Sequence, residues 1–378
     1  MCIFNVIINL WGDKMEKKIK SNTSRLIEID YMEIIAIFFV VFYHCGRYSF
    51  DFLNNYAVSD YLIYFSRTIL ATCVPIFFFA NGYLLLNKPF DLKKHIKKTL
   101  TLFLLVFIWA FLLMPIYLLI ANEPVTLSAI VVPILNLSVD YDMNLFWYLG
   151  ALICIYILFP VLKVCFDNNK KAFAFFVIVI CFLTLVFDLV NEVFLVSGTV
   201  THTLENGIEV PIITMFNPFR GAYGYSFVFF GIGGLIFDFK DRILKIKAYK
   251  RNLISIFGIF INCICLFVMG LLHSKFITNN PWDIVWNGYD TVFNLLNVLF
   301  IFTLCLNFKK DNKLIKAISC NTLGIYFIHG LFITLIERFF INALNNFGMS
   351  IVTAFIVLLC SFLISFVMKK IPLIKKLV

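Results

Sequence analysis

His44 and Glu33 are the two residues whose types and spacing are best suited to chemistry. They lie eleven residues apart in an apolar stretch, which places them within about 20° of each other on a helix. Asp30, Ile37 and Val41 complete the same stripe. Because ionisable side chains are costly inside a membrane and mark function by default, we expect the stripe to face the interior of a helix bundle. An imidazole there could act as a general base toward a hydroxyl. An interfacial histidine hydrogen-bonded to another helix fits the spacing equally well.

A second group of polar residues lies in apolar stretches further along the chain. His329 and Tyr326 are three residues apart and would share one face of a helix, and Asn81 is followed by Gly82. A glycine lets two helices approach closely, and an amide or imidazole can hydrogen-bond from one helix to the next. Contacts between helices therefore explain these residues as well as a place in a substrate path does.

The segment 88–98 is rich in basic residues and has the sequence KPFDLKKHIKK. Such a loop can orient the protein in the membrane, or it can contact anionic lipid. Each basic residue near the surface adds about 1 kcal/mol of attraction to anionic lipid. It can also hold the phosphates of a donor molecule, with its lysines as point charges. The other histidines are expected in loops, without a role in the site: His95, His202 and His273.

Membrane-spanning helices must position these residues. Of the 378 residues, 61% are hydrophobic and 14% charged, whereas soluble domains are about 45–50% apolar and about 25% charged. Uncharged stretches of about 18 residues or more recur, each long enough to cross the hydrocarbon core as a helix. The segment 125–137 is a possible interfacial or re-entrant piece. The expected spans are 29–48, 64–86, 99–121, 145–162, 172–190, 222–237, 252–272, 290–308, 318–337 and 348–368.

The positions of the basic residues give the orientation. When successive loops are assigned to alternate sides, only five of the 32 Lys and Arg fall on one side: Arg47, Arg67, Arg220, Lys275 and Arg338. Positive loops stay in the cytoplasm, so we predict an all-α integral membrane protein with both termini cytoplasmic, a bundle of about ten transmembrane helices. The net charge of +10 lies in these short clusters, which favours an orientation signal over nucleic-acid binding.

The chain is expected to form one domain. Residues 1–25 are expected to form a cytoplasmic N-terminal segment. Residues 1–14 are interpreted as a start-site artefact, because Met15 is followed by a basic segment that is a more conventional N-terminus. The transmembrane domain covers 26–370, and 371–378 form a cytoplasmic tail. The tryptophans at positions 147, 282 and 286 lie near the outer interface, where anchoring alone would explain them.

Four segments in series resemble the membrane-bound acyltransferase 3 family of bacterial O-acyltransferases. The segment 29–44 is similar to the family's first span, in which a histidine follows an arginine after ten residues. PIFFFANGYL at 75–84 resembles the family's PxFFxxSGY. FWYL at 146–149, with Leu152, Tyr156 and Pro160, resembles its WFL…L…Y…P pattern, and GIYFIH at 324–329 resembles its IYLIH. The resemblance extends from about residue 25 to the end of the chain.

This resemblance implies transfer of an acyl group, usually acetyl from acetyl-CoA, to a hydroxyl of an extracytoplasmic glycan or cell-surface polymer. The protein would be a cell-membrane acyltransferase for groups other than aminoacyl, with no bound cofactor or metal. Its partners would be acyl-CoA, the acceptor and the lipid bilayer, and no nucleic acid. By this analogy the catalytic residues are His44 and Glu33, and Lys94, Lys97 and Lys98 bind the donor. The cavity would be lined by Asn81, Trp147, Tyr148, Tyr326 and His329.

Three departures from the family pattern bear on this interpretation. Glu33 stands where the family commonly has arginine, lysines replace both arginines of the loop motif, and Asn81 replaces a serine. The loop change keeps the charge, whereas Glu33 reverses it. A different donor, a compensating cation from another helix or a loss of transferase activity would each account for Glu33. A transporter or flippase, or a non-catalytic component of a polysaccharide system, therefore remains an alternative.

Overall fold

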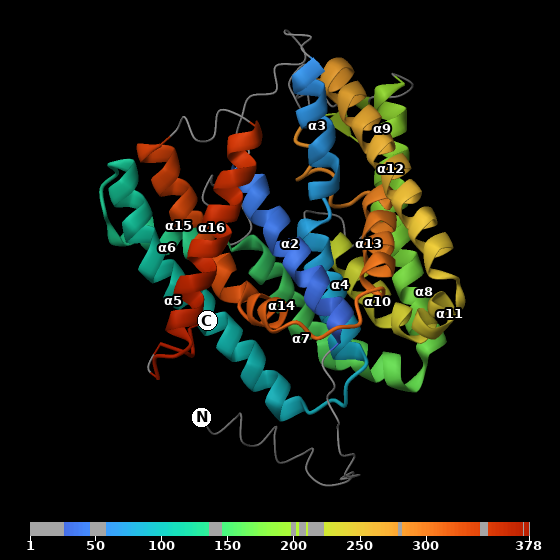
Figure 1. Cartoon of the computed structure of the whole chain (residues 1–378), viewed down its shortest axis with the longest axis horizontal. Helices are drawn as coiled ribbons and strands as arrows, with labels where there is room; N and C mark the ends of the chain where they lie inside the picture. The colour runs from blue at the N-terminus through green and yellow to red at the C-terminus, as the bar shows by residue number, and fades with distance from the viewer. Residues whose placement is uncertain are drawn as a thin grey trace.

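The computed structural model describes residues 26–45, 58–135, 146–197, 202–203, 209–210, 223–278, 282–340, 347–372 and 374–377. These residues are almost entirely helical (Figure 1). A short antiparallel pair, β1 (His202–Thr203) and β2 (Glu209–Val210), aligns His202 with Val210. The α-helices are α2 (Ile27–Cys45), α3 (Val58–Leu70), α4 (Cys73–Leu86), α5 (Leu92–Ala121), α6 (Leu127–Leu135), α7 (Trp147–Asn168), α8 (Lys170–Cys181), α9 (Phe187–Val196), α10 (Tyr225–Ile236), α11 (Lys240–Lys245), α12 (Ala248–His273), α13 (Val292–Cys305), α14 (Lys313–Ser319), α15 (Thr322–Phe339) and α16 (Phe347–Met368). A π-helical turn, η1 (Phe182–Val186), joins α8 to α9, a 3₁₀ turn, η2 (Phe237–Phe239), joins α10 to α11, and a second π-helical turn, η3 (Ser274–Thr278), follows α12.

Seven helical segments are long and apolar enough to cross a membrane, counted over the residues that the structure describes. They are Val58–Leu86, Leu92–Ala121, Trp147–Asn168, Lys170–Val196, Ala248–Phe276, Thr322–Phe339 and Phe347–Met368. The other three expected spans coincide with α2, α10 and α13. The helix α2 carries three carboxylates, and α10 and α13 have 12 and 14 residues, about 18 and 21 Å against a core of about 30 Å. The count of ten and the cytoplasmic placement of both termini remain predictions.

The helices α2 and α4 form the centre of the bundle (Figure 1). In that view α5, α15 and α16 lie on one side of them, and α8, α12 and α13 on the other. Residues 73–80 of α4 are all buried. The outward faces of α5, α7, α8, α12 and α16 instead expose large apolar side chains, which suits contact with lipid tails. Examples are Leu104, Ile157, Phe175, Phe257 and Leu359.

A close crossing of α4 and α10 holds the centre together. A Cβ atom added to Gly82 would lie 1.8 Å from the backbone oxygen of Phe230, and one added to Gly233 would lie 2.1 Å from that of Phe79. Only glycine permits these contacts, so the sequence-based expectation of a close helix approach at Gly82 is confirmed.

Two expectations about the lysine-rich segment are wrong. It was expected to be a loop over 88–98, but α5 begins at Leu92, because the side chain of Asp91 accepts a hydrogen bond from the Lys94 amide (3.0 Å) and caps the helix. His95 therefore lies in the first turns of α5, where it is buried. His273, also expected in a loop, is the last residue of α12.

Candidate active site

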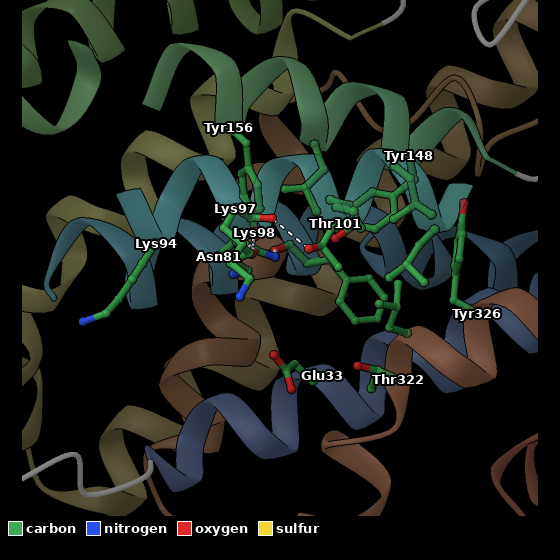
Figure 2. A pocket seen from close by; sticks show the side chains of 16 residues that line it. Glu33, Asn81, Lys94, Lys97, Lys98, Thr101, Tyr148, Tyr156, Thr322 and Tyr326 are labelled. Carbon is green, nitrogen blue, oxygen red and sulfur yellow. Dashed lines mark hydrogen bonds between the residues drawn. The ribbon is translucent and has the colours of Figure 1, made fainter. Parts of the chain in front are cut away.

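A cavity of about 500 Å³ lies among α2, α4, α5, α7 and α15 (Figure 2). Lys94, Lys97 and Lys98 line one end of it, and because these side chains are exposed, this end opens to solvent. Tyr148 and Tyr326 line the other end. The cavity therefore joins a cationic mouth to an aromatic end inside the bundle.

The lysines reach the cavity together because α5 is already helical at this point. Positions 94, 97 and 98 are separated by three and four residues, so they share one face of the helix. Thr101, Leu102 and Leu105 continue that face further into the cavity. The amide and the ammonium of Lys94 both donate to Asp91, which holds the pKa of the Asp91 carboxyl below its ordinary value. The cap of α5 thus also fixes where the cationic face begins.

Tyr156 links three helices at the edge of the cationic mouth. Its hydroxyl accepts a hydrogen bond from Lys98 Nζ (3.1 Å) and donates one to Asn81 Oδ1 (2.8 Å). Asn81 Nδ2 in turn donates to the backbone oxygen of Phe77 (2.9 Å). The ring nitrogen Nε2 of His95 lies 2.7 Å from the backbone oxygen of Tyr156. Sequence reasoning gave His95 no role, although Pro89 and the cap at Asp91 were signals that a helix begins there.

Glu33 lies across the cavity from Tyr156 (Figure 2). Its Oε2 is 2.6 Å from Ser319 Oγ, which is also 2.8 Å from Asp30 Oδ1. A hydroxyl has one proton, so Ser319 donates to one of the two carboxylates at a time. Glu33, the carboxylate that departs from the family pattern, lines the same cavity as the three lysines. Three lysines against one carboxylate give the described lining of this cavity an excess of positive charge.

His44 and His329 form a pair beyond the aromatic end of the cavity. Their ring centroids are 5.5 Å apart, and the ring of Tyr326, which lines the cavity, is 5.8 Å from that of His329. His329 Nδ1 lies 2.7 Å from the backbone oxygen of Tyr326 and 3.2 Å from that of Ile325. Because carbonyl oxygens only accept, Nδ1 carries the proton in the neutral ring and Nε2 is left as an acceptor. That Nε2 is buried and has no hydrogen-bond partner among the described residues.

The expected stripe on α2 faces the bundle. Ile37 and Val41 are fully buried and Asp30 nearly so, while Glu33 and His44 are half-buried. The spacing of the stripe therefore predicted its direction, although His44 is not among the described residues that line the cavity. The described ring contacts link His44 to the cavity through His329 and Tyr326.

The expected lining residues divide into two groups. Asn81, Tyr148 and Tyr326 line the cavity, whereas Trp147 and His329 are not among its described lining residues. Successive residues of a helix point about 100° apart, so Trp147 turns away where Tyr148 turns inward. Trp147 instead packs against other aromatic rings at the start of α7: Tyr223, Trp286 and Tyr289.

Long apolar helices around a half-open cationic cavity define a polytopic membrane protein. The acyltransferase 3 family model, described as an acyltransferase domain, matches residues 26–370, so the chain belongs to this family. The match covers nearly the entire chain and supports a membrane acyltransferase in general. No curated protein and no solved structure matches the chain.

Proposed function

We propose that the protein transfers an acyl group, most simply acetyl, from cytoplasmic acyl-CoA to a hydroxyl of an extracytoplasmic glycan or cell-surface polymer. The observation that carries the proposal is the single cavity that connects Lys94, Lys97 and Lys98 to the tyrosines next to the histidine pair. Its volume of about 500 Å³ falls within the range of small-molecule sites.

The lysine end suits the phosphates of the donor. The three ammonium groups provide point charges that neutralise phosphate without requiring the fixed geometry of an arginine fork. Beyond them, Leu102, Leu105 and Leu152 give the cavity an apolar wall, which suits the flexible arm that carries the thioester. From Lys94 to Leu105 the helix rises about 17 Å, so the thioester would lie well inside the bundle.

The histidine pair would supply the base. The oxygen of the acceptor hydroxyl attacks the thioester carbonyl carbon, the bond between carbon and sulfur breaks, and CoA leaves as its thiolate. His44 accepts the proton of the hydroxyl and returns it to the thiolate, so that an ester and free CoA are formed. Because Tyr326 and His329 stand between the cavity and His44, the acceptor and the thioester must meet beside these two side chains.

A purified-protein assay tests the proposal. The full chain in lipid nanodiscs is supplied with radiolabelled acetyl-CoA and cell-envelope acceptor, and free CoA and labelled acceptor are both measured. We expect His44→Ala to insert normally and to lose both products, whereas Phe355→Ala, which removes an exposed side chain of α16, keeps them. A fully active His44→Ala variant contradicts the assignment of the base. In sealed vesicles, acceptor movement across the membrane without CoA release would identify a transporter or flippase instead.

A further inference from the structure

A second cavity, of about 290 Å³, lies at the opposite end of the bundle from the lysines. It is bounded by α9, α10, α12 and the segment 282–291. The helix α12 starts next to Lys247 and, after 26 residues or about 39 Å, ends at His273, which lines this cavity. If the lysine end is cytoplasmic, the second cavity is extracytoplasmic.

Aromatic side chains form much of its wall. Trp282, Trp286, Tyr225 and Tyr289 all line it. The rings of Trp286 and Tyr289 are 5.9 Å apart, as are those of Tyr225 and Tyr289, and His273 stacks on Trp282 at 5.1 Å. Trp286 remains 40% exposed, so a broad apolar face is available at the rim. Such faces bind flat, partly apolar ligands by burying their area.

The polar part of the wall is acidic. Asp188, Glu192 and Asp290 line the cavity, and no lysine or arginine does so among the described residues. His273, the basic side chain among the described lining residues, is already engaged, because its Nδ1 lies 2.5 Å from Glu192 Oε1. Asp290 has no hydrogen bond from another described side chain, and burial, together with the nearby charges of Asp188 and Glu192, raises its pKa to about 7.

We infer that this cavity binds a sugar unit of the acceptor, one that is neutral or carries an amine, and that it excludes phosphate- and carboxylate-bearing polymers. A pyranose ring offers an apolar C–H face to the aromatic wall and hydroxyls to the carboxylates and to Asn287, which also lines the cavity. An amine would gain from the carboxylates and from the tryptophan faces. An anionic group would face like charges.

The first turn of α7 connects this cavity to the proposed reaction centre. Trp147 packs on Trp286 (5.0 Å) and Tyr289 (5.7 Å) of the outer cavity, while the next residue, Tyr148, packs on Tyr326 (5.6 Å) at the aromatic end of the inner one. The two cavities are thus separated by this turn of helix. A sugar held outside would place the next unit of its polymer near the histidine pair. This inference rests on the proposed function.

Equilibrium binding of defined tetrasaccharides to the full chain in nanodiscs tests the inference without an acyl donor. The probes are the N-acetylglucosamine tetramer, which is neutral, the glucosamine tetramer, which is cationic, and tetragalacturonate, which is anionic. We expect the first two to bind at least tenfold more tightly than the third. Trp286→Ala should weaken their binding at least fivefold, and Asp188→Lys should shift the preference toward tetragalacturonate. Phe276→Ala, an exposed aromatic residue outside the cavity, is the matched control and should change nothing.

Three outcomes overturn the inference: equal binding of the anionic tetramer, undiminished binding by Trp286→Ala, and no binding of any tetramer. None of these outcomes bears on the donor chemistry, because no acyl-CoA is present. Conversely, a His44→Ala variant that keeps full transferase activity contradicts the proposed base and leaves sugar binding untouched. A Trp286→Ala enzyme with an unchanged KM for its polymer acceptor would also overturn the inference while the transferase proposal stands.

Discussion

The hydroxyl of Tyr156 offers the sharpest test of how the cationic mouth is organised. Tyr156→Phe removes one bond from Lys98 (3.1 Å) and one to Asn81 (2.8 Å). A typical hydrogen bond contributes about 0.5–1.5 kcal/mol net, and a bond to a charged group about 1.5–3 kcal/mol. Because the Lys98 side chain is exposed to water, we assign its bond the lower of these two ranges. Water in the cavity can partly replace the hydroxyl for Asn81. Donor binding loses this energy only as far as the bonds hold Lys98 in its phosphate-binding position, so we expect an effect of about 0.7–1.4 kcal/mol, a three- to tenfold rise in Kd for acetyl-CoA.

A double-mutant cycle separates this effect from a general disturbance. Lys98→Met alone should weaken acetyl-CoA binding by a similar factor, because it removes one phosphate-binding charge. If Tyr156 acts by holding Lys98 over the cavity, the double variant should bind better than the product of the single effects predicts, with a coupling of at least about 0.5 kcal/mol. Binding of radiolabelled acetyl-CoA to purified protein in nanodiscs gives all four values.

Tyr117→Phe is the matched control. Tyr117 lies on α5, the helix that carries Lys98, is buried, and its hydroxyl has no hydrogen-bond partner among the described residues. Removing that hydroxyl should leave donor binding unchanged. Strictly additive effects of the Lys98 and Tyr156 substitutions would refute the reasoning about the tyrosine. Unchanged binding in both single variants would remove Lys98 from the donor site.

Three further predictions follow from other features. Glu33→Gln removes the one carboxylate among the described residues that line the cationic cavity and should tighten acetyl-CoA binding about three- to tenfold in the same assay, whereas weaker binding would give Glu33 a direct role in holding the donor. Gly82→Ala should sharply lower the yield of folded protein in size-exclusion chromatography, because its new Cβ would meet a backbone oxygen of α10 that cannot move aside. Asp290→Asn should raise the thermal midpoint most at high pH. The pKa of the Asp290 carboxyl is near 4 in the unfolded chain and about 7 in the fold, where burial and the charges of Asp188 and Glu192 raise it. The wild-type protein therefore loses stability as pH rises between these two values, and the asparagine variant does not. A gain over wild type that grows from about pH 4 to pH 7 and is level above it is the expected profile; a constant gain would point to packing instead.

The sequence predicted the helical segments well because apolar runs and charged loops are local properties. It placed the start of α5 too late, at 99, because the apolar run begins only after the lysines, whereas the helix begins at the capping residue Asp91. It predicted one span over 64–86, and Val58–Leu86 is one apolar segment, but hydropathy gave no sign of the turn at residues 71–72 between α3 and α4. Where helix ends depend on single side chains, hydropathy alone is too coarse.

The site was predicted in part for the same reason. Periodicity places Glu33 on an inward face, and the family motifs direct attention to Asn81, Tyr148 and Tyr326. The contacts that organise the site join residues far apart in sequence, such as Lys98 with Tyr156 and His44 with His329. These depend on how α5 packs on α7 and α2 on α15, which neither spacing nor composition determines.

The carboxylates of α2 have a consequence for the order in which the protein assembles. Glu28 pairs with Lys240 (2.5 Å), and Asp30 lies next to Ser319, more than two hundred residues away in each case. During synthesis α2 therefore emerges long before these two partners. If α2 is a membrane span, its stable integration depends on the chain beyond residue 239, so a nascent protein ending before α11 should expose this helix to quality-control proteases.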